Sequence, residues 1–359
     1  RSPGGLDAVA DADIPDAEAL GEVIGDSGVG DFDRVALDAF LDDKAVSFSP
    51  SVDPFTDGMF GTAATDDLEV LFQLIHLMMT TPRADGVAVD RYVDGRLPFA
   101  EDPSIDAGYA EFDALLNARY DDPRFLLPTP ATLATVNADG IERIAAERFG
   151  DVGDWSFSFS GDYDINDAVE LARAYVGSLP AAGTSEPLTF DEPPPPAGVV
   201  VVETEAGQGD AANVSFLYTA SASSARRDDV LARTVREVIG NRLTDFIREE
   251  LGDSYSPFAA VDIGGGETPA VETYISVSTA PDLAEEVSDA VLEQLGLLRA
   301  AGPSAQEFAN AIATVAEQLD FINNAQINGE VLAVLVDPGG NASFDDFTNQ
   351  PRLIATITA

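Results

Sequence analysis

The sequence predicts an α+β protein made of two related domains. Segments with apolar residues at three- and four-residue spacing take turns with short segments in which apolar and polar residues alternate, so both helices and strands are expected. A proline-rich stretch interrupts this pattern near the middle of the chain. On each side of it a strand precedes a helix with an acidic start, at Phe157–Leu179 and at Tyr274–Leu298, which is a weak internal repeat.

The composition excludes several classes of function. Asp and Glu number 64 against 19 Lys and Arg, so the net charge is −45. Such a surface repels phosphate backbones and anionic lipid, and neither nucleic acid nor a membrane is expected as a partner. The absence of cysteine excludes disulfides, thiolate zinc sites and a cysteine nucleophile. A saline habitat and a GC-rich genome are equally open as causes of the acidity.

The first domain is expected at residues 1–180. Its helices are predicted at Asp16–Ile24, Phe32–Phe40, Asp67–Thr81, Phe112–Tyr120, Asn137–Phe149 and Asp167–Leu179. Its strands are predicted at Ala45–Ser51 and Trp155–Ser160. Pro82 ends the long apolar helix, because a proline lacks the N–H that a helix needs.

Residues 181–197 are expected to form a stiff extended connector, because four consecutive prolines exclude a helix or a central strand. The second domain follows at residues 198–359. Its strands are predicted at Val199–Glu205, Ala212–Tyr218 and Val271–Thr279, and its later helices at Pro281–Leu298 and Ser304–Ile322.

The stretch from Val230 to Phe258 is central to the second domain. Apolar residues recur at helical spacing up to Ile247, Gly252 ends the helix, and the segment SYSPFAAVDI then has the pattern of a strand. Arg248 and Tyr255 flank this corner. The residues alone favour a structural role, in which Arg248 pairs with a neighbouring carboxylate and Tyr255 packs in the core.

The segment REELGDSY, from Arg248 to Tyr255, resembles the R-E-x-x-G-x-x-Y segment of pitrilysin-type zinc peptidases. This family includes insulin-degrading enzyme, mitochondrial processing peptidase and bacterial periplasmic relatives, to which the likeness is greatest. The stretches SGVGDF, AVSFSPSV, DLEVLFQLIHLMMTTPRAD and WSFSFSGDYD also match, in the same order, so the resemblance covers most of the chain. It implies two domains of mostly antiparallel sheet covered by helices, as in the LuxS/MPP-like metallohydrolase fold. Compared with the family, the first domain is expected to lack its N-terminal strands and the second its C-terminal end.

The resemblance also assigns roles to residues. Arg248 and Tyr255 would bind the substrate backbone and the oxygen that gains charge when water attacks, while zinc is held by the other half of the enzyme. The family's zinc motif, H-x-x-E-H, would fall at Ala19, Glu22 and Val23, where both histidines are absent. The chain therefore resembles the family's non-catalytic C-terminal half, with no metal site or catalytic residue of its own.

The expected function is that of the substrate-positioning half of a zinc metalloendopeptidase, periplasmic or extracellular, which hydrolyses nothing alone. Its partners would be an unfolded peptide and the zinc-binding half, on the same polypeptide or on a separate subunit. One alternative is a catalytically inactive family member that serves as a scaffold or peptide-binding subunit. Another is an unrelated acidic binding protein with a ligand pocket between its domains.

Three further features favour structural explanations. His76, the only histidine, has no His or Glu four residues on and is expected to be packed and hydrogen-bonded. The run Asp162–Asp167 lacks the glycine and glutamate of a calcium loop and is expected to cap a helix. Gly264–Gly266 precedes no helix, so a hairpin is expected instead of a phosphate-binding loop.

Overall fold

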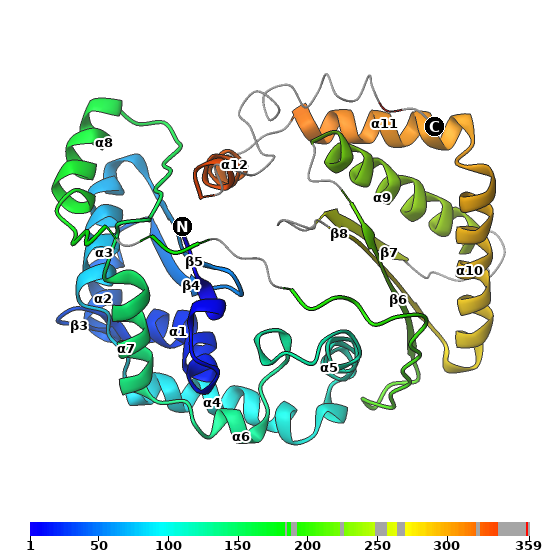
Figure 1. The fold of residues 1–359 in the computed structure, drawn as a ribbon, viewed down its shortest axis with the longest axis horizontal. Helices are drawn as coiled ribbons and strands as arrows, with labels where there is room; N and C mark the ends of the chain where they lie inside the picture. The colour runs from blue at the N-terminus through cyan, green and yellow to red at the C-terminus, as the bar shows by residue number, and fades with distance from the viewer. Residues whose placement is uncertain are drawn as a thin grey trace. The chain divides into compact units, whose positions relative to one another are not determined.

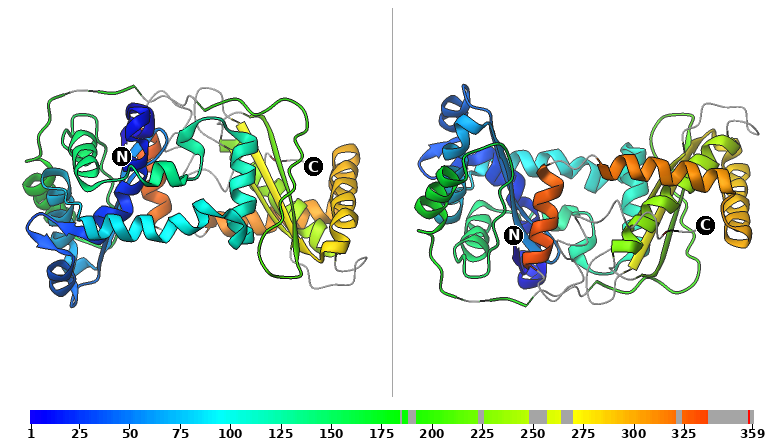
Figure 2. Two further views of the ribbon diagram at one scale, coloured as in Figure 1. Left: turned by 90° about the horizontal axis from the view of Figure 1, so that it is seen from below. Right: turned by 90° about the horizontal axis from the view of Figure 1, so that it is seen from above.

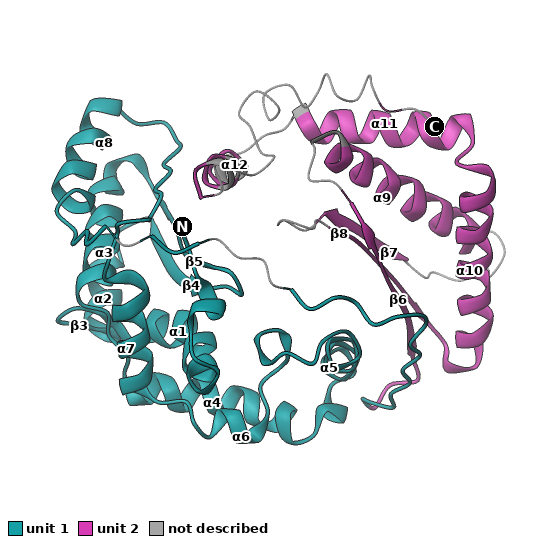
Figure 3. Ribbon diagram, in the orientation of Figure 1, with its two compact units in different colours: residues 1–207 teal, residues 208–359 magenta. Residues whose placement is uncertain are grey.

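The computed structural model describes residues 1–183, 185–187, 192–222, 226–247, 257–263, 270–320, 324–336 and 357 (Figure 1). The chain forms two compact units, residues 1–207 and residues 208–359 (Figure 3). The division lies beyond the predicted domain start at residue 198, because part of the connector contacts the first unit. Arg119 donates hydrogen bonds to Glu192 Oε1 and to the Pro193 carbonyl, at 2.8 and 2.9 Å. The Gly207 N–H donates to the Ser104 carbonyl at 2.7 Å.

The first unit contains most of the helices. Its α-helices are α1 (Ile14–Ser27), α2 (Arg34–Leu41), α3 (Leu68–Thr80), α4 (Gly86–Glu101), α5 (Ala107–Arg119), α6 (Pro130–Leu133), α7 (Ala138–Phe149) and α8 (Ile165–Leu171). A π-helical turn, Ala172–Val176, continues α8, and short 3-10 turns lie at Gly5–Ala8, Asp11–Asp13, Thr65–Asp67, Pro103–Ile105 and Pro123–Phe125. The strands are β1 (Ser2–Pro3), β2 (Gly28–Val29), β3 (Phe32–Asp33), β4 (Val46–Val52) and β5 (Thr56–Ala63).

The sheet of the first unit has the antiparallel order β1-β5-β4, and β2 pairs with β3 in a separate two-stranded hairpin. Helices α1 and α3 pack against the sheet, and their apolar faces form the largest buried cluster, together with α4 and α7. Helix α1 approaches β4 closely at Gly21, where a Cβ atom would lie 2.6 Å from the Pro50 carbonyl oxygen. Only glycine therefore allows this helix-on-sheet packing.

A buried charge cluster joins the sheet, α7 and the connector. Arg148 of α7 donates to Asp57 Oδ2 at 2.6 Å and to both carboxylate oxygens of Glu186. The side chains of Asp57 and Arg148 are 0% and 9% exposed. Removing one partner of a buried pair of this kind leaves an uncompensated charge, which lowers the free energy of unfolding by about 3 to 5 kcal/mol. Glu186 thus holds the start of the connector on the first unit.

In its described residues, the second unit is a three-stranded antiparallel sheet with helices on one side. Its elements are β6 (Ala212–Ser221), α9 (Arg226–Phe246), β7 (Phe258–Ile263), β8 (Ala270–Thr279), a 3-10 turn (Pro281–Leu283), α10 (Ala284–Ala301), α11 (Ala305–Asp320) and α12 (Asn324–Val336). The strand order is β6-β8-β7. Helices α9 and α10 lie on the same face of this sheet (Figures 1 and 2), where Ile275 and Val277 of β8 are fully buried. Helix α11 packs on α9.

Most predicted elements are confirmed, with shifts at their ends. The structure adds elements that the sequence pattern did not reveal: β1, β2, β3, β5, α4, α6 and α12. Two predicted strands are wrong. Residues 155–160 form no strand, although Ser156 exchanges backbone hydrogen bonds with Arg1. Residues 199–205 join no sheet, and the side chains of Val199 and Val201 in this segment are 90% and 77% exposed. The predicted helix end at Gly252 and the hairpin at residues 264–266 lie outside the described residues.

Candidate functional site

Helix α1 carries the three positions at which the resemblance places the zinc motif. Ala19 and Val23 lie on the face of α1 that packs into the core of the first unit, and both are 0% exposed. Glu22 lies on the solvent side of the helix, with 47% of its side chain exposed. Zinc needs imidazole, thiolate or carboxylate donors, and the alkyl groups of Ala19 and Val23 supply none. These positions therefore do not fit a zinc ion.

Arg96 of α4 holds the carboxylate of Glu22. The Arg96 Nη1 and Nη2 atoms lie 3.1 and 2.6 Å from the two carboxylate oxygens, and the guanidinium carbon lies 3.9 Å from the ring centre of Tyr92. A planar guanidinium suits this combination of a two-pronged pair and a stacked ring. Glu22 is therefore engaged with an internal cation and not free to activate water.

Glu18 lies one helical turn before Glu22 and is half-buried. Burial raises the pKa of Glu18 to about 7, although the nearby charge of Arg96 opposes the shift. Burial also raises the pKa of Tyr92 to about 12, so its phenol stays neutral. Within the described part of the chain, no three His, Asp or Glu side chains are grouped so that they could hold a metal ion.

Arg248 and Tyr255, the predicted substrate-binding pair, lie outside the described residues. The described part of α9 shows how the helix that leads to them is held. Leu243 and Ile247 are 1% and 0% exposed and pack against the sheet of the second unit. The last turns of α9 are thus fixed by the core just before Arg248.

A charge pair also joins α9 to α11. The Arg242 Nε and Nη2 atoms lie 2.6 and 2.8 Å from the two carboxylate oxygens of Glu307. Glu307 and Ser304 cap the start of α11 reciprocally, since each side chain accepts a hydrogen bond from the other's backbone N–H. The hydrogen bonds from Arg242, with help from those of Ser304, lower the pKa of Glu307 to about 2 despite its partial burial.

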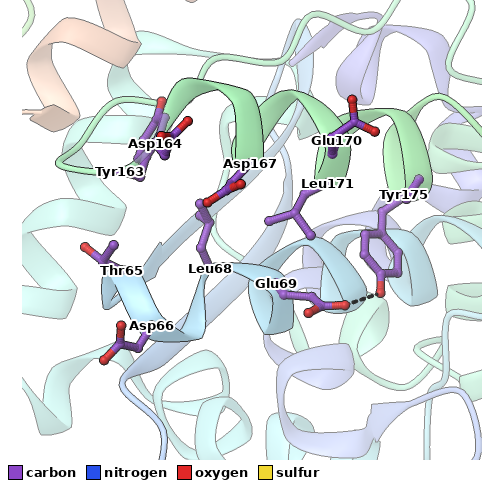
Figure 4. Close-up of a pocket in the computed structure, with 11 residues that line it drawn as sticks. Thr65, Asp66, Leu68, Glu69, Tyr163, Asp164, Asp167, Glu170, Leu171 and Tyr175 are labelled. Atoms are coloured by element: carbon purple, nitrogen blue, oxygen red, sulfur yellow. Dashed lines mark hydrogen bonds between the residues drawn. The ribbon is translucent and has the colours of Figure 1, made fainter.

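An acidic cleft of about 600 Å³ lies between the start of α3 and α8 with its π-helical turn (Figure 4). Five carboxylates line it: Asp66, Glu69, Asp164, Asp167 and Glu170. Tyr175 donates its hydroxyl hydrogen to Glu69 Oε1 at 2.8 Å across the cleft. The cleft can attract cations, but its carboxylates do not form a metal-binding group.

The structural explanations for His76 and for the Asp-rich run are confirmed. His76 Nδ1 lies 2.8 Å from the Tyr175 carbonyl oxygen, so this histidine is packed and hydrogen-bonded. Asp164 accepts a hydrogen bond from the Asn166 N–H at 2.7 Å and caps α8.

Sequence reasoning missed the residues of α4 that face the zinc-motif positions. The buried residues of α4 are Ala88, Val89 and Tyr92. Their helical spacing in the sequence is the signal that could have predicted this helix. Gly95 and Pro98 lie inside the same helix and obscure it, because both residues ordinarily mark helix ends. In the residues described, no helix is long and apolar enough to cross a membrane.

A family model described as the peptidase M16 inactive domain matches residues 153–315. This chain contains an M16 inactive domain. The match confirms the pitrilysin-type resemblance and supports an inactive-domain assignment for residues 153–315. No curated protein sequence matches the chain.

Solved structures share the fold of this chain. The periplasmic protease PqqL from Escherichia coli is 19% identical with a TM-score of 0.77, over 96% of this chain and 39% of PqqL. A peptidase M16 inactive domain from Pseudomonas fluorescens is 15% identical with a TM-score of 0.75, over 96% of this chain and 82% of that one. The protease FusC, solved in complex with Arabidopsis ferredoxin, is 15% identical with a TM-score of 0.71, over 96% of this chain and 37% of FusC. The predicted α+β fold is confirmed, and the chain spans well under half the length of the two named proteases.

Proposed function

We propose that this chain is the non-catalytic, substrate-positioning half of a pitrilysin-type zinc metalloendopeptidase. The observation that carries the proposal is the burial of Ala19 and Val23 in a chain that matches the inactive domain of this family. A half whose zinc-motif positions are part of its hydrophobic core contributes to peptide hydrolysis by binding and orienting the substrate.

The chemistry is divided between two halves in this proposal. The partner half, fused or separate, holds zinc and supplies the activated water. Arg248 and Tyr255 of this chain hydrogen-bond the peptide backbone and stabilise the oxygen that becomes negative in the transition state. Donors fixed in advance stabilise that charge without reorganising.

Two named relatives support parts of this proposal. PqqL is a periplasmic protease and FusC is a protease that was solved with a protein partner. We propose that this chain acts in the periplasm or outside the cell, with an unfolded polypeptide segment as its substrate. The net charge of −45 favours cationic peptides through long-range attraction, which weakens as salt is added.

Binding of a fluorescently labelled unfolded peptide tests the positioning role. We expect the Arg248→Ala and Tyr255→Phe variants to lose affinity at both low and high salt, since direct hydrogen bonds are screened far less than long-range attraction. If both variants bind as the unmodified chain does, the two residues are structural and the scaffold alternative gains.

A peptidase assay tests the absence of catalysis in the isolated chain. With zinc added, we expect no turnover of an unstructured fluorogenic peptide, because the zinc-motif positions supply no imidazole. Turnover that a chelator abolishes would disprove this part of the proposal. Adding the zinc-binding half should restore cleavage, and Arg248→Ala should lower that cleavage mainly through kcat.

A further inference from the structure

Strand β4 forms the outer edge of the first unit's sheet. The N–H of Ala64 donates to the Ala45 carbonyl at 2.9 Å, which sets the pairing of β4 with β5. Because alternate residues of an antiparallel strand point their backbone groups to opposite sides, the N–H and C=O groups of Val46 and Phe48 point away from β5. No other strand of the described chain pairs with that side of β4.

A cavity of about 240 Å³ lies directly beside this edge. It is bounded by Leu37 and Leu41 of α2, by Val46 and Phe48 of β4, and by Leu74 and Met78 of α3. A cavity of roughly 150 Å³ with such a lining can hold benzene, so this one has room for a leucine or phenylalanine side chain. An exposed strand edge next to an apolar pocket is the arrangement by which added peptide strands are recognised.

The segment that contains α2, which forms one wall of the cavity, is acidic. Residues 31–44, which include α2, contain five Asp residues against Arg34 and Lys44. Both cations already have partners, since Arg34 pairs with Asp38 and Lys44 with Asp43. The side chains of Asp38 and Asp43 remain 55% and 81% exposed. The segment that contains α2 therefore carries excess negative charge, which complements basic residues on either side of a bound apolar side chain.

We propose that the outer edge of β4 and the adjoining cavity bind an extended peptide segment that carries a large apolar side chain flanked by lysine or arginine. The segment adds backbone hydrogen bonds to Val46 and Phe48, and its apolar side chain fills the cavity. This inference rests on the proposed peptide-binding function and adds a selective subsite to it, apart from Arg248 and Tyr255. A second copy of this chain is a poor occupant, because two chains of charge −45 repel each other.

Gly25 offers a way to block the cavity without disturbing the fold. It lies in α1 and lines the cavity, and a Cβ atom built on it would meet no atom within 4 Å. The Gly25→Leu variant therefore fills the cavity with its own side chain, and leucine favours a helix more than glycine does. Gly95→Leu is the matched control, since Gly95 also lies in a helix with no atom within 4 Å of a Cβ and does not line the cavity.

The probes are two fluorescein-labelled decapeptides with lysines on both sides of the central residue, which is leucine in one and serine in the other. Fluorescence anisotropy with the unmodified chain should show roughly ten- to hundredfold tighter binding of the leucine peptide. Gly95→Leu should keep this preference and Gly25→Leu should abolish it. Equal binding of both peptides by the unmodified chain, or an unchanged preference in Gly25→Leu, would overturn the proposal.

Two further measurements separate this subsite from the proposed function and from self-association. Arg248→Ala should keep the preference for leucine, so a failure at Arg248 is distinct from a failure of the cavity. Sedimentation velocity should show a monomer. Self-association that Gly25→Leu abolishes would assign the cavity to a second copy and overturn the proposal.

Discussion

Helices α1 and α9 each pack on the sheet of their own unit, and the family resemblance assigns chemistry to both. On α1 the positions of the zinc motif have become part of the core, as Ala19 and Val23 show. On α9 the core residues Leu243 and Ile247 come shortly before Arg248 in the sequence, and Arg248 itself lies outside the described residues. The comparison teaches that loss of metal chemistry in α1 involves the shape of the core as well as the missing histidines.

The same comparison extends to two glutamates that touch these helices. Glu18 on α1 is half-buried, and its pKa is raised to about 7 by burial. Glu307 on α11 is paired with Arg242 of α9, and its pKa is lowered to about 2 by hydrogen bonding. One carboxyl group therefore opposes folding when it ionises, whereas the other stabilises the fold only when it is ionised.

The largest effect is expected from restoring the histidines to α1. The Ala19→His, Val23→His double variant should lose roughly 4 kcal/mol or more of unfolding free energy, because two imidazoles overpack a close-packed core and bury polar groups. Urea unfolding measures the loss, and titration calorimetry should detect no zinc binding. Glu22→His, on the exposed side of the same helix, is the control and should cost under about 1 kcal/mol. Tight zinc binding by a stable double variant would contradict the core interpretation.

The next largest loss of stability is expected from truncating a leucine in the core of each unit. Leu20→Ala in α1 and Leu243→Ala in α9 should each cost about 2 to 5 kcal/mol, since both leucines are almost fully buried. If the units unfold separately, scanning calorimetry will show each variant lowering one of two transitions. Leu297→Ala, at a position that is 50% exposed, should shift neither transition by much. A single transition that both buried variants lower would show that the two units unfold together.

Acid should weaken the α9–α11 contact selectively. Because the folded pKa of Glu307 is about 2 and its ordinary value is 4.5, the stabilisation is complete above pH 4.5 and is lost as the pH falls toward 2. We expect Arg242→Met to remove about 2 kcal/mol at neutral pH and to flatten this part of the pH dependence. Thermal unfolding between pH 2 and pH 6 tests the prediction, and an unchanged acid slope in the variant would contradict it.

The smallest effect is expected at Glu18 and has the opposite sign. Between pH 4.5 and pH 7 the folded chain keeps a proton that the unfolded chain has lost, so stability falls as the pH rises through this window. Glu18→Gln should therefore stabilise the chain by about 1 to 2 kcal/mol at pH 8 and change little at pH 4. Arg96→Gln should move the window to higher pH, because Arg96 favours the ionised form of Glu18. If the melting temperature falls with pH as much in Glu18→Gln as in the unmodified chain, Glu18 is not the source of this pH dependence.

Sequence reasoning recovered the elements whose apolar spacing is regular, and it failed where close packing demanded glycine. Strand β5 contains Gly58 and Gly61, and a Cβ atom at Gly61 would lie 2.6 Å from Leu71 and 3.0 Å from the Ser47 carbonyl oxygen. Tertiary contacts require these glycines, yet in sequence they weaken the strand pattern. Gly95 also hid α4, and with it the arginine that binds Glu22, although no close contact requires a glycine there.

The site residues were predictable to different degrees. The resemblance alone located Ala19, Glu22 and Val23, and spacing on one helix then explains why Ala19 and Val23 share the buried face. The partner of Glu22 comes from α4 and the partner of Arg242 from α11, each far along the chain. Helical periodicity carries no information about such long-range pairs, so only the folded structure reveals them.

The contacts between the connector and the first unit decide where the chain can be cut to express that unit alone. The prolines of the connector suggest a domain boundary near residue 180. A fragment that ends there would lose Glu186 and leave Arg148 and Asp57 without their third partner. It would also lose Glu192, the partner of Arg119, whose side chain is 7% exposed. A separately expressed first unit should therefore extend through Gly207. For the same reason a protease should cut more readily after Gly207 than at the start of the connector.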